Sequence, residues 1–296
     1  MTPGEAEAVA QAVSGVRSYI RSRGTTPYGV RKFRKLVKDF YRDFGRDLPW
    51  RRTEDSYRIL VSEVMLQQTQ VTRVCEKFPE FIREFPDFSS LARASVKKLL
   101  AVWKGMGYNR RALALRNTAL KVEKEYGGVL PDEEEKLVQL PGIGPATAAD
   151  ILAFAFSKPA LVIETNIRAV YIHIFFSSGE TVGDSRIRPL VLRTMDRKNP
   201  GDWYNGLMDL GAFIKKEYVN PASRSRHYTK QSPFEGSNRQ MRSLILSFLM
   251  ENGPDTADRI SVKLEIPVEK TKKNLVQLEK EGFVRESGAE YSIEEV

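Results

Sequence analysis

Helical spacing of apolar residues is the feature that most limits how this chain can fold. From the first residues to about residue 156, apolar side chains recur at i, i+3 and i+4, and proline or glycine separates successive stretches. These stretches span residues 4–23, 30–50, 56–85, 90–106, 110–127, 132–140 and 145–156. No stretch before residue 280 alternates apolar and polar residues as a half-buried strand does. The sequence therefore predicts an all-α body with short connections.

The end of the chain has a different organisation. Three short helical segments span residues 242–253, 255–266 and 268–282. The following stretch, FVRESGAEYSI, predicts a strand, a turn at Ser-Gly and a second strand. Three helices followed by a hairpin is the order of a winged helix. The third segment carries Lys270, Lys272 and Lys273, which favour contact with DNA, and a basic protein-docking module is the alternative.

Charge indicates the class of partner. The 296 residues include 47 Lys or Arg against 38 Asp or Glu, which gives a net charge of +9. This excess favours nucleic acid, then an acidic membrane, and a basic surface without a ligand is the alternative. No stretch reaches the roughly 18 apolar residues of a membrane span, and the acidic start does not resemble a secretory signal. We expect a monomeric cytoplasmic protein associated with the nucleoid.

Cysteine and histidine are too scarce for a metal site. The lone cysteine, Cys75, excludes an intramolecular disulfide and any cage of several cysteines. We expect Cys75 to be a small buried residue. His173 lies in the apolar run VYIHIFF, which predicts a core histidine, and His227 is the only other one.

The stretch LPGIGPATA, residues 140–148, predicts a hairpin between two helices. Gly142 and Gly144 have no Cβ, so backbone N–H groups can point outward at the start of the second helix. With Thr147 in the first turn, this helix N-terminus favours an anion such as a DNA phosphate. A tight turn without a ligand is the alternative.

Glu63 lies among apolar residues in RILVSEVMLQQTQVTRV. If the stretch is helical, Glu63 shares a face with Gln67 and Gln70. Apolar neighbours should raise the pKa of Glu63, which suits a general acid. A polar stripe on a surface helix is the alternative.

Glu164 is a second acid in apolar surroundings, in LVIETNIRAV. It either caps the next helix together with Thr165 and Asn166 or holds a carboxylate against a developing positive charge. Two such acids, a phosphate-binding hairpin and a basic surface favour hydrolysis of a glycosidic bond in DNA. The base must first leave the stack.

Five segments resemble the helix-hairpin-helix DNA glycosylases, most closely the adenine DNA glycosylases. They are LPWRRTEDSYRILVSEVMLQQTQV, KGMGYNRRALAL, LPGIGPATAADILAFAF, ETNIRAV and MDLGAF, within residues 30–214. The resemblance implies two helical domains with the active site between them. It divides the chain into an extension (1–28), a discontinuous domain (29–56 and 167–219), a hairpin domain (57–166), a basic loop (220–240) and a winged helix (241–296).

The resemblance also assigns roles by position. Glu63 matches the acid that protonates adenine and handles the attacking water. Glu164 takes the place of the catalytic aspartate, and Asn166 that of its polar partner. Gln67 and Gln68 match residues that fill or probe the gap left in the duplex.

Three further positions follow from the same resemblance. Tyr108 matches a tyrosine that wedges near the opposite base. Arg51 and Asp209 match positions around the adenine pocket. The alternatives are that Arg51 is a structural partner of a nearby acid and that Asp209 caps a helix.

The chain departs from the family pattern in several places. Ala146 stands where bifunctional relatives have a lysine nucleophile, so we expect no Schiff base and no strand cleavage. Most relatives hold an iron–sulfur cluster through four cysteines after MDLGA, and this chain has none there, so we expect no cluster. We expect the loop with Arg224, Arg226 and Lys230 to dock DNA instead, and a plain linker is the alternative.

The expected function is removal of adenine opposite 8-oxoguanine or guanine in double-stranded DNA, without strand cleavage. The usual C-terminal β-rich domain that recognises 8-oxoguanine is replaced by the winged helix. A glycosylase that removes thymine or uracil opposite guanine is the alternative on the same scaffold. A non-catalytic DNA-binding protein is the alternative from another class.

Overall fold

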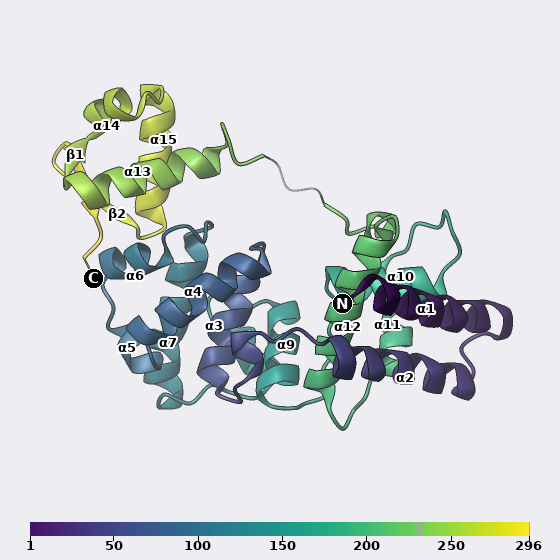
Figure 1. The fold of residues 1–296 in the computed structure, drawn as a ribbon. Coiled ribbons are helices and arrows are strands. Elements are labelled where there is room, and N and C mark those ends of the chain that lie inside the picture. The colour runs from purple at the N-terminus through teal and green to yellow at the C-terminus, as the bar shows by residue number, and fades with distance from the viewer. Residues whose placement is uncertain (230–232, 296) are drawn as a thin grey trace. The chain divides into compact units, whose positions relative to one another are not determined.

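The computed structural model describes residues 1–229 and 233–295, which form two compact units (Figure 1). Unit 1 holds residues 1–59, 132–138 and 143–230, and unit 2 holds residues 60–131, 139–142 and 231–296. The prediction of a helical body is confirmed. The division differs from the expected one, because residues 143–166 join unit 1 and the C-terminal segment joins unit 2.

Unit 1 is built around a buried helix. Its elements are α1 (Pro3–Arg23), α2 (Pro27–Phe44), the 3₁₀ turn η1 (Pro49–Arg51), α8 (Glu134–Leu137), α9 (Pro145–Ala155), α10 (Thr165–Phe175), α11 (Asp184–Thr194), α12 (Pro200–Glu217) and the 3₁₀ turn η2 (Pro221–Arg224). Ile167, Val170 and Ile172 of α10 are fully buried. Because α10 carries apolar residues on nearly every side, other helices of unit 1 pack around it.

The N-terminal helix is part of this core. A capping box between Thr2 and Glu5 begins α1, and Thr26 caps the start of α2. Val13 and Ile20 of α1 are buried in the same apolar cluster as α2 and α10. Residues 1–28 therefore are a structural element of unit 1.

Unit 2 begins within α3 (Ser56–Leu66). It continues with α4 (Val71–Glu84), α5 (Phe88–Ala92), α6 (Val96–Trp103) and α7 (Arg110–Tyr126). The single helical stretch expected over residues 56–85 is two helices. Gln68 adopts a left-handed backbone (φ 57°) and Gln70 is the N-cap of α4, so α3 ends at Leu66. The shared helical face predicted for Glu63 and Gln70 is therefore wrong.

The C-terminal module, residues 238–295, also belongs to unit 2. Its elements are α13 (Asn238–Asn252), β1 (Asp255–Thr256), α14 (Ala257–Leu264), α15 (Val268–Lys280), β2 (Val284–Ser287) and β3 (Glu290–Ile293). The predicted hairpin is confirmed: β2 and β3 pair antiparallel, with Val284 opposite Ile293. Sequence reasoning missed β1, which pairs with β3 over two residues only.

The module shares its apolar core with α6. Val96 and Leu100 of α6 belong to the same buried cluster as Ile245 and Leu246 of α13 and Leu275 of α15. On α15 the buried residues alternate in helical fashion with an exposed face that carries Lys270, Lys272 and Lys273. The module therefore is anchored to the helices of unit 2.

His173 and Cys75 were both expected to be buried, and the structure confirms this only for His173. His173 is buried on α10 beside Tyr218, with ring centroids 4.4 Å apart. Burial, together with the charges of Arg17, Arg21 and Arg224, lowers the pKa of His173 to about 4, so it is a neutral core histidine as predicted. Cys75 on α4 is only half-buried, which corrects the expectation of a buried residue.

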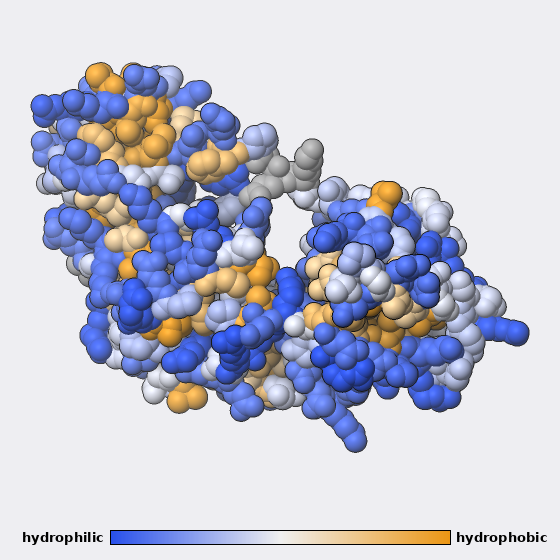
Figure 2. Space-filling view, in the orientation of Figure 1, coloured by the Kyte–Doolittle hydropathy of each residue, from blue (hydrophilic) through white to orange (hydrophobic). Residues whose placement is uncertain are grey.

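Hydrophilic residues dominate the visible face of each unit (Figure 2). None of the helices in the described ranges combines the length and the apolar character needed to cross a bilayer.

Two substitutions on α1 test whether it belongs to the core. Ile20 is 4% exposed, so Ile20→Ala should lower the free energy of unfolding by about 2–5 kcal/mol. Gly15 lies on the exposed side of the same helix with open space around it. Gly15→Ala should therefore raise this free energy by about 0.5–1 kcal/mol, because glycine disfavours helix. Urea denaturation measures both, and an Ile20→Ala loss no larger than the Gly15→Ala gain would contradict the packing.

Candidate active site

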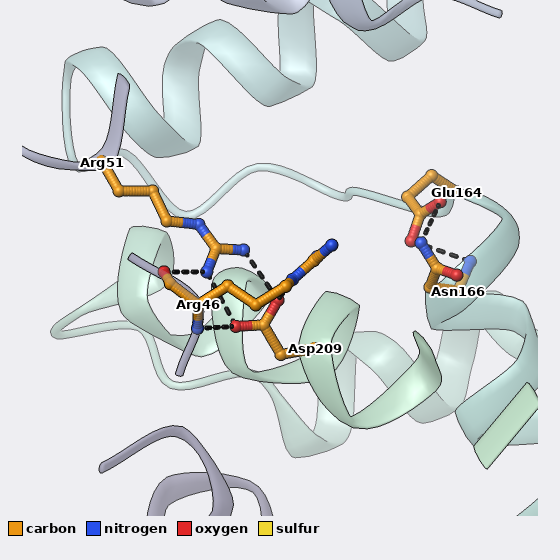
Figure 3. Close-up of polar contacts among 5 residues, drawn as sticks. All are labelled: Arg46, Arg51, Glu164, Asn166 and Asp209. Carbon is orange, nitrogen blue, oxygen red and sulfur yellow. Dashed lines mark hydrogen bonds and ion pairs between the residues drawn. The ribbon is translucent and has the colours of Figure 1, made fainter. Parts of the chain in front are cut away.

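Glu164 is the N-cap of α10 (Figure 3). Its Oε1 accepts hydrogen bonds from the backbone N–H groups of Asn166 (2.8 Å) and Ile167 (3.0 Å). Its Oε2 accepts only a longer bond, 3.4 Å, from Nδ2 of Asn166. Glu164 therefore caps the helix, mainly through Oε1, while Oε2 takes only the longer bond.

Some of the surroundings of Glu164 raise its pKa and others lower it. Burial raises the pKa of Glu164, while the two amide hydrogen bonds and the charges of Lys215 and Arg168 lower it, and burial is the larger effect. Lys215, on α12, also donates from Nζ to Oδ1 of Asn166 at 3.1 Å. The carboxylate thus lies in a poorly solvated place that nonetheless supplies hydrogen-bond donors and cations. Both interpretations of Glu164, as a cap and as a charge-stabilising group, fit this geometry.

A glycine on α12 sets the position of the α10 N-terminus. A Cβ added at Gly211 would lie 2.2 Å from the carbonyl oxygen of Asn166 and 2.6 Å from its carbonyl carbon. Real Cβ atoms do not come this close to backbone, so only glycine fits at residue 211. This explains the glycine in the MDLGAF motif.

Asp209 and Arg51 form a buried ion pair (Figure 3). Nη1 and Nη2 of Arg51 donate to the two carboxylate oxygens of Asp209 at 2.7 and 3.0 Å. The backbone N–H and Nε of Arg46 donate to the same oxygens at 2.8 and 2.6 Å. Arg51 is therefore a structural partner of an acid. The alternative that Asp209 is a helix cap is wrong, because it lies inside α12.

Four further predicted residues lie in unit 2: Glu63, Gln67, Gln68 and Tyr108. Glu63 is half-buried near the end of α3, Gln67 lies just beyond that helix, and Gln68 is exposed in the turn. Tyr108 is half-buried before α7 and has a left-handed backbone, with φ 48°. Left-handed residues other than glycine are strained, and such strain concentrates at functional sites. Two of the residues implied to probe the duplex, Gln68 and Tyr108, share this property.

Sequence reasoning missed Arg111, which supports the helix that carries Glu63. Nη1 of Arg111 donates to the carbonyl oxygens of Val64 and Met65, both at 2.9 Å, and so caps the end of α3. Nη2 donates to the carbonyl oxygens of Met106 and Gly107, both at 3.0 Å. Burial lowers the pKa of Arg111 to about 10, which leaves it charged at neutral pH. The only sequence signal was an arginine at an inward-facing helical position.

The hairpin has the local structure that was predicted. Gly142 has φ 78°, and a Cβ there would lie 2.8 Å from Cβ of Ala114, so glycine is required. Gly144 is the N-cap of α9 and offers no side-chain cap, and a Cβ there would meet open space. Thr147 is half-buried in the first turn of α9. An uncapped helix start with space before it is suited to an anion.

The first part of the basic loop, up to Arg226, is fixed to unit 1. Its backbone pairs with Val182: the N–H of Val182 donates to the carbonyl oxygen of Arg224 at 2.9 Å, and the N–H of Arg226 donates to that of Val182 at 3.0 Å. Arg224 also donates from its side chain to the carbonyl oxygens of Ser177 and Glu180, which makes it structural. Arg226 is exposed. Lys230 lies outside the described residues.

No group of three or more His, Cys, Asp or Glu side chains in the described ranges could hold a metal ion. An iron–sulfur cluster needs four thiolates. The residues that follow Gly211 offer no cysteine, so they do not fit the cluster that the resemblance implies.

The raised pKa of Glu164 predicts how stability depends on pH. The ordinary pKa of a glutamate is 4.5, and above that pH Glu164 stays protonated to a higher pH in the folded chain than in the unfolded chain. The stability of the wild type relative to Glu164→Gln should therefore fall as pH rises through the window between the ordinary and the raised pKa. Glu134→Gln, at an exposed glutamate of α8, is the control and should show no such trend. Urea denaturation at several pH values measures both, and a pH-independent difference for Glu164→Gln would contradict the burial of its charge.

Comparison with known proteins identifies the family of this chain. Residues 61–188 match the family described as HhH-GPD superfamily base excision DNA repair protein. The adenine DNA glycosylase of Mycolicibacterium smegmatis is 31% identical over 230 residues, which cover 72% of this chain and 78% of that protein. The adenine DNA glycosylase of Buchnera aphidicola subsp. Baizongia pistaciae is 32% identical over 187 residues, which cover 62% of this chain.

The chain spans about half the length of the Buchnera relative, 52%. Among solved structures, a thermostable thymine-DNA glycosylase is 26% identical with a TM-score of 0.56, over 62% of this chain and 86% of that one. The sequence matches and the fold agree, and the chain belongs to the adenine DNA glycosylase family of the HhH-GPD superfamily.

Proposed function

We propose that the protein hydrolyses the N-glycosidic bond of adenine opposite 8-oxoguanine or guanine in double-stranded DNA. The observation that carries this proposal is the carboxylate of Glu164. Two backbone N–H groups donate hydrogen bonds to its Oε1, and these bonds and the charges of Lys215 and Arg168 favour the ionised form against the burial that raises its pKa. A carboxylate so placed can stabilise positive charge that develops on a deoxyribose ring.

The two glutamates take different roles in this reaction. Glu63 donates a proton to the adenine ring, so that the base leaves as a neutral molecule, and then accepts the proton of the attacking water. In its ionised form, Glu164 stabilises the oxocarbenium-like sugar between these events. Its Oε2, which takes only one long hydrogen bond, is the oxygen suited to this. The longer side chain of glutamate reaches further than the usual aspartate would.

We propose that the enzyme is monofunctional and needs no cofactor. Ala146 occupies the position where a lysine would form a Schiff base, so the abasic product is left uncut. The segment that in relatives holds a cluster is fixed here by the backbone pairing at Val182 and by the bonds of Arg224.

DNA binding is proposed to use three basic or amide-rich elements. The hairpin with Gly142, Gly144 and Thr147 would hold one phosphate, and the exposed Arg226 would contact another. The C-terminal module would act as a winged helix, with the lysine face of α15 toward DNA. The protein would work at the nucleoid as a monomer.

A second candidate keeps the scaffold but changes the excised base. The likeness to a thymine-DNA glycosylase favours removal of thymine or uracil opposite guanine. The carboxylate that stabilises the sugar would serve in both reactions, because positive charge develops on the deoxyribose whichever base leaves.

A panel of duplexes containing A:8-oxoG, A:G, T:G or U:G tests both candidates. We expect alkali-dependent strand breaks with the adenine duplexes only, because the enzyme leaves an abasic site and does not cut it. Glu63→Gln should reduce excision by about 100-fold or more while affinity stays within a few-fold, since general acid catalysis is lost. Breaks only at T:G and U:G support the second candidate. Binding without excision of any base would contradict both and indicate a DNA-binding protein.

The salt dependence of binding tests the basic loop. Replacing Arg224, Arg226 and Lys230 with alanine should reduce the slope of log affinity against log salt by about 0.9 for each phosphate that the loop no longer neutralises. Arg226→Ala alone is the informative single variant, because Arg224→Ala also removes the hydrogen bonds to Ser177 and Glu180. An unchanged slope in the triple variant would show that the loop does not contact DNA.

A further inference from the structure

Arg239, at the start of α13, reaches from the C-terminal module to Tyr108. Its Nη1 donates a hydrogen bond to Oη of Tyr108. Its guanidinium also lies over the Tyr108 ring, 5.0 Å from the centroid, and over the ring of Phe234 at 5.5 Å. One arginine of the module therefore contacts both the ring and the hydroxyl of a residue implied to enter the duplex.

Tyr108 needs such support because of its backbone. It follows Gly105 and Gly107, which both have positive φ, and itself has φ 48°. A tyrosine in this conformation persists only where its surroundings hold it. The guanidinium of Arg111 lies 5.6 Å from the same ring centroid, so two guanidinium groups contact the side chain.

The contact continues to the helix that carries Glu63. Arg111 binds the carbonyl oxygens of Val64 and Met65 at the end of α3, and those of Met106 and Gly107 just before Tyr108. A continuous set of polar contacts thus runs from Arg239 through Tyr108 and Arg111 to α3. All of these residues belong to unit 2.

The packing of the C-terminal module fixes the position of the helix that carries Arg239. Its core includes Val96 and Leu100 of α6. At the surface, Lys104 pairs with Glu251 of α13 at 3.0 Å, and Arg110 pairs with Glu281 at 3.1 Å. Arg239 is therefore presented by a packed helix rather than by a loose tail.

We propose that Arg239 is a positioning residue that presets Tyr108 for probing the duplex, so that the C-terminal module takes part in recognising the lesion. This inference rests on the proposed function in taking DNA as the ligand, and on the family resemblance in taking Tyr108 as a residue that probes the duplex. Preorganisation of a strained side chain improves recognition because the cost of ordering it is met before DNA binds. The module would thus act through Tyr108 in addition to any contact of its own with DNA.

The experiment measures discrimination in binding as well as excision. Affinity is compared between a duplex with a tetrahydrofuran abasic analogue opposite 8-oxoguanine and the fully paired duplex. We expect Arg239→Ala to reduce the ratio of these affinities by about tenfold. Arg239→Lys should restore only part of it, since lysine keeps a donor and a cation but loses the planar group that lies over the rings. Glu251→Ala, which removes the ion pair of α13 with Lys104 and leaves the Arg239–Tyr108 hydrogen bond in place, is the matched control and should keep the ratio.

A double-mutant cycle separates positioning from general stability. Tyr108→Phe removes the hydroxyl that Arg239 binds, so Arg239→Ala should have a smaller effect in the Tyr108→Phe background than in the wild type. Equal effects in both backgrounds, or equal ratios for Arg239→Ala and Glu251→Ala, would overturn the proposal. A wild type that binds both duplexes equally would also overturn it. If the wild type distinguishes the two duplexes but excises no base, the proposed function is contradicted. The double-mutant cycle then decides the inference on Arg239.

Discussion

The close approach of α12 to the first turn of α10 is the constraint on which the site in unit 1 depends. Gly211 lets the two helices approach until a Cβ would overlap the backbone of Asn166. At that separation Lys215 reaches the Asn166 side chain, and the amides that hold Glu164 are fixed in place. Any larger residue at 211 must displace the N-terminus of α10, and with it the carboxylate. The absence of a side chain at Gly211 on one helix thus positions the carboxylate of Glu164 on another.

Both units use arginines with several hydrogen bonds each to fix the elements near the glutamates. In unit 1, Arg51 and Arg46 together bind both carboxylate oxygens of Asp209 inside α12. In unit 2, Arg111 caps the end of α3, which carries Glu63. Removing one partner of a buried ion pair such as that of Arg51 and Asp209 costs about 3–5 kcal/mol, because the other charge is then left buried without compensation. Each unit thus holds the helix near its glutamate through an arginine with several hydrogen bonds.

Much of this organisation was predictable from sequence because it rests on local rules. The helical body, the hairpin, the core position of His173 and the cap at Glu164 follow from periodicity, glycine placement and burial. The end of α3 was not predictable, because apolar spacing runs through it and only the left-handed Gln68 breaks the helix. Arg111 and Arg239 were missed for a different reason. Arg111 caps α3 through Met65, 46 residues away, and Arg239 binds Tyr108, 131 residues away, and no local pattern reveals such partners.

The central claim is that Glu164 stabilises positive charge on the sugar. Affinity for a duplex with a cationic pyrrolidine in place of the adenine nucleotide, compared with a neutral tetrahydrofuran analogue, measures this directly. The wild type should prefer the cationic duplex by about tenfold or more at a neutral pH, and Glu164→Gln should lose the preference while it still binds the neutral duplex. Equal affinity of the wild type for both duplexes, or a preference that survives in Glu164→Gln, would contradict this role of Glu164.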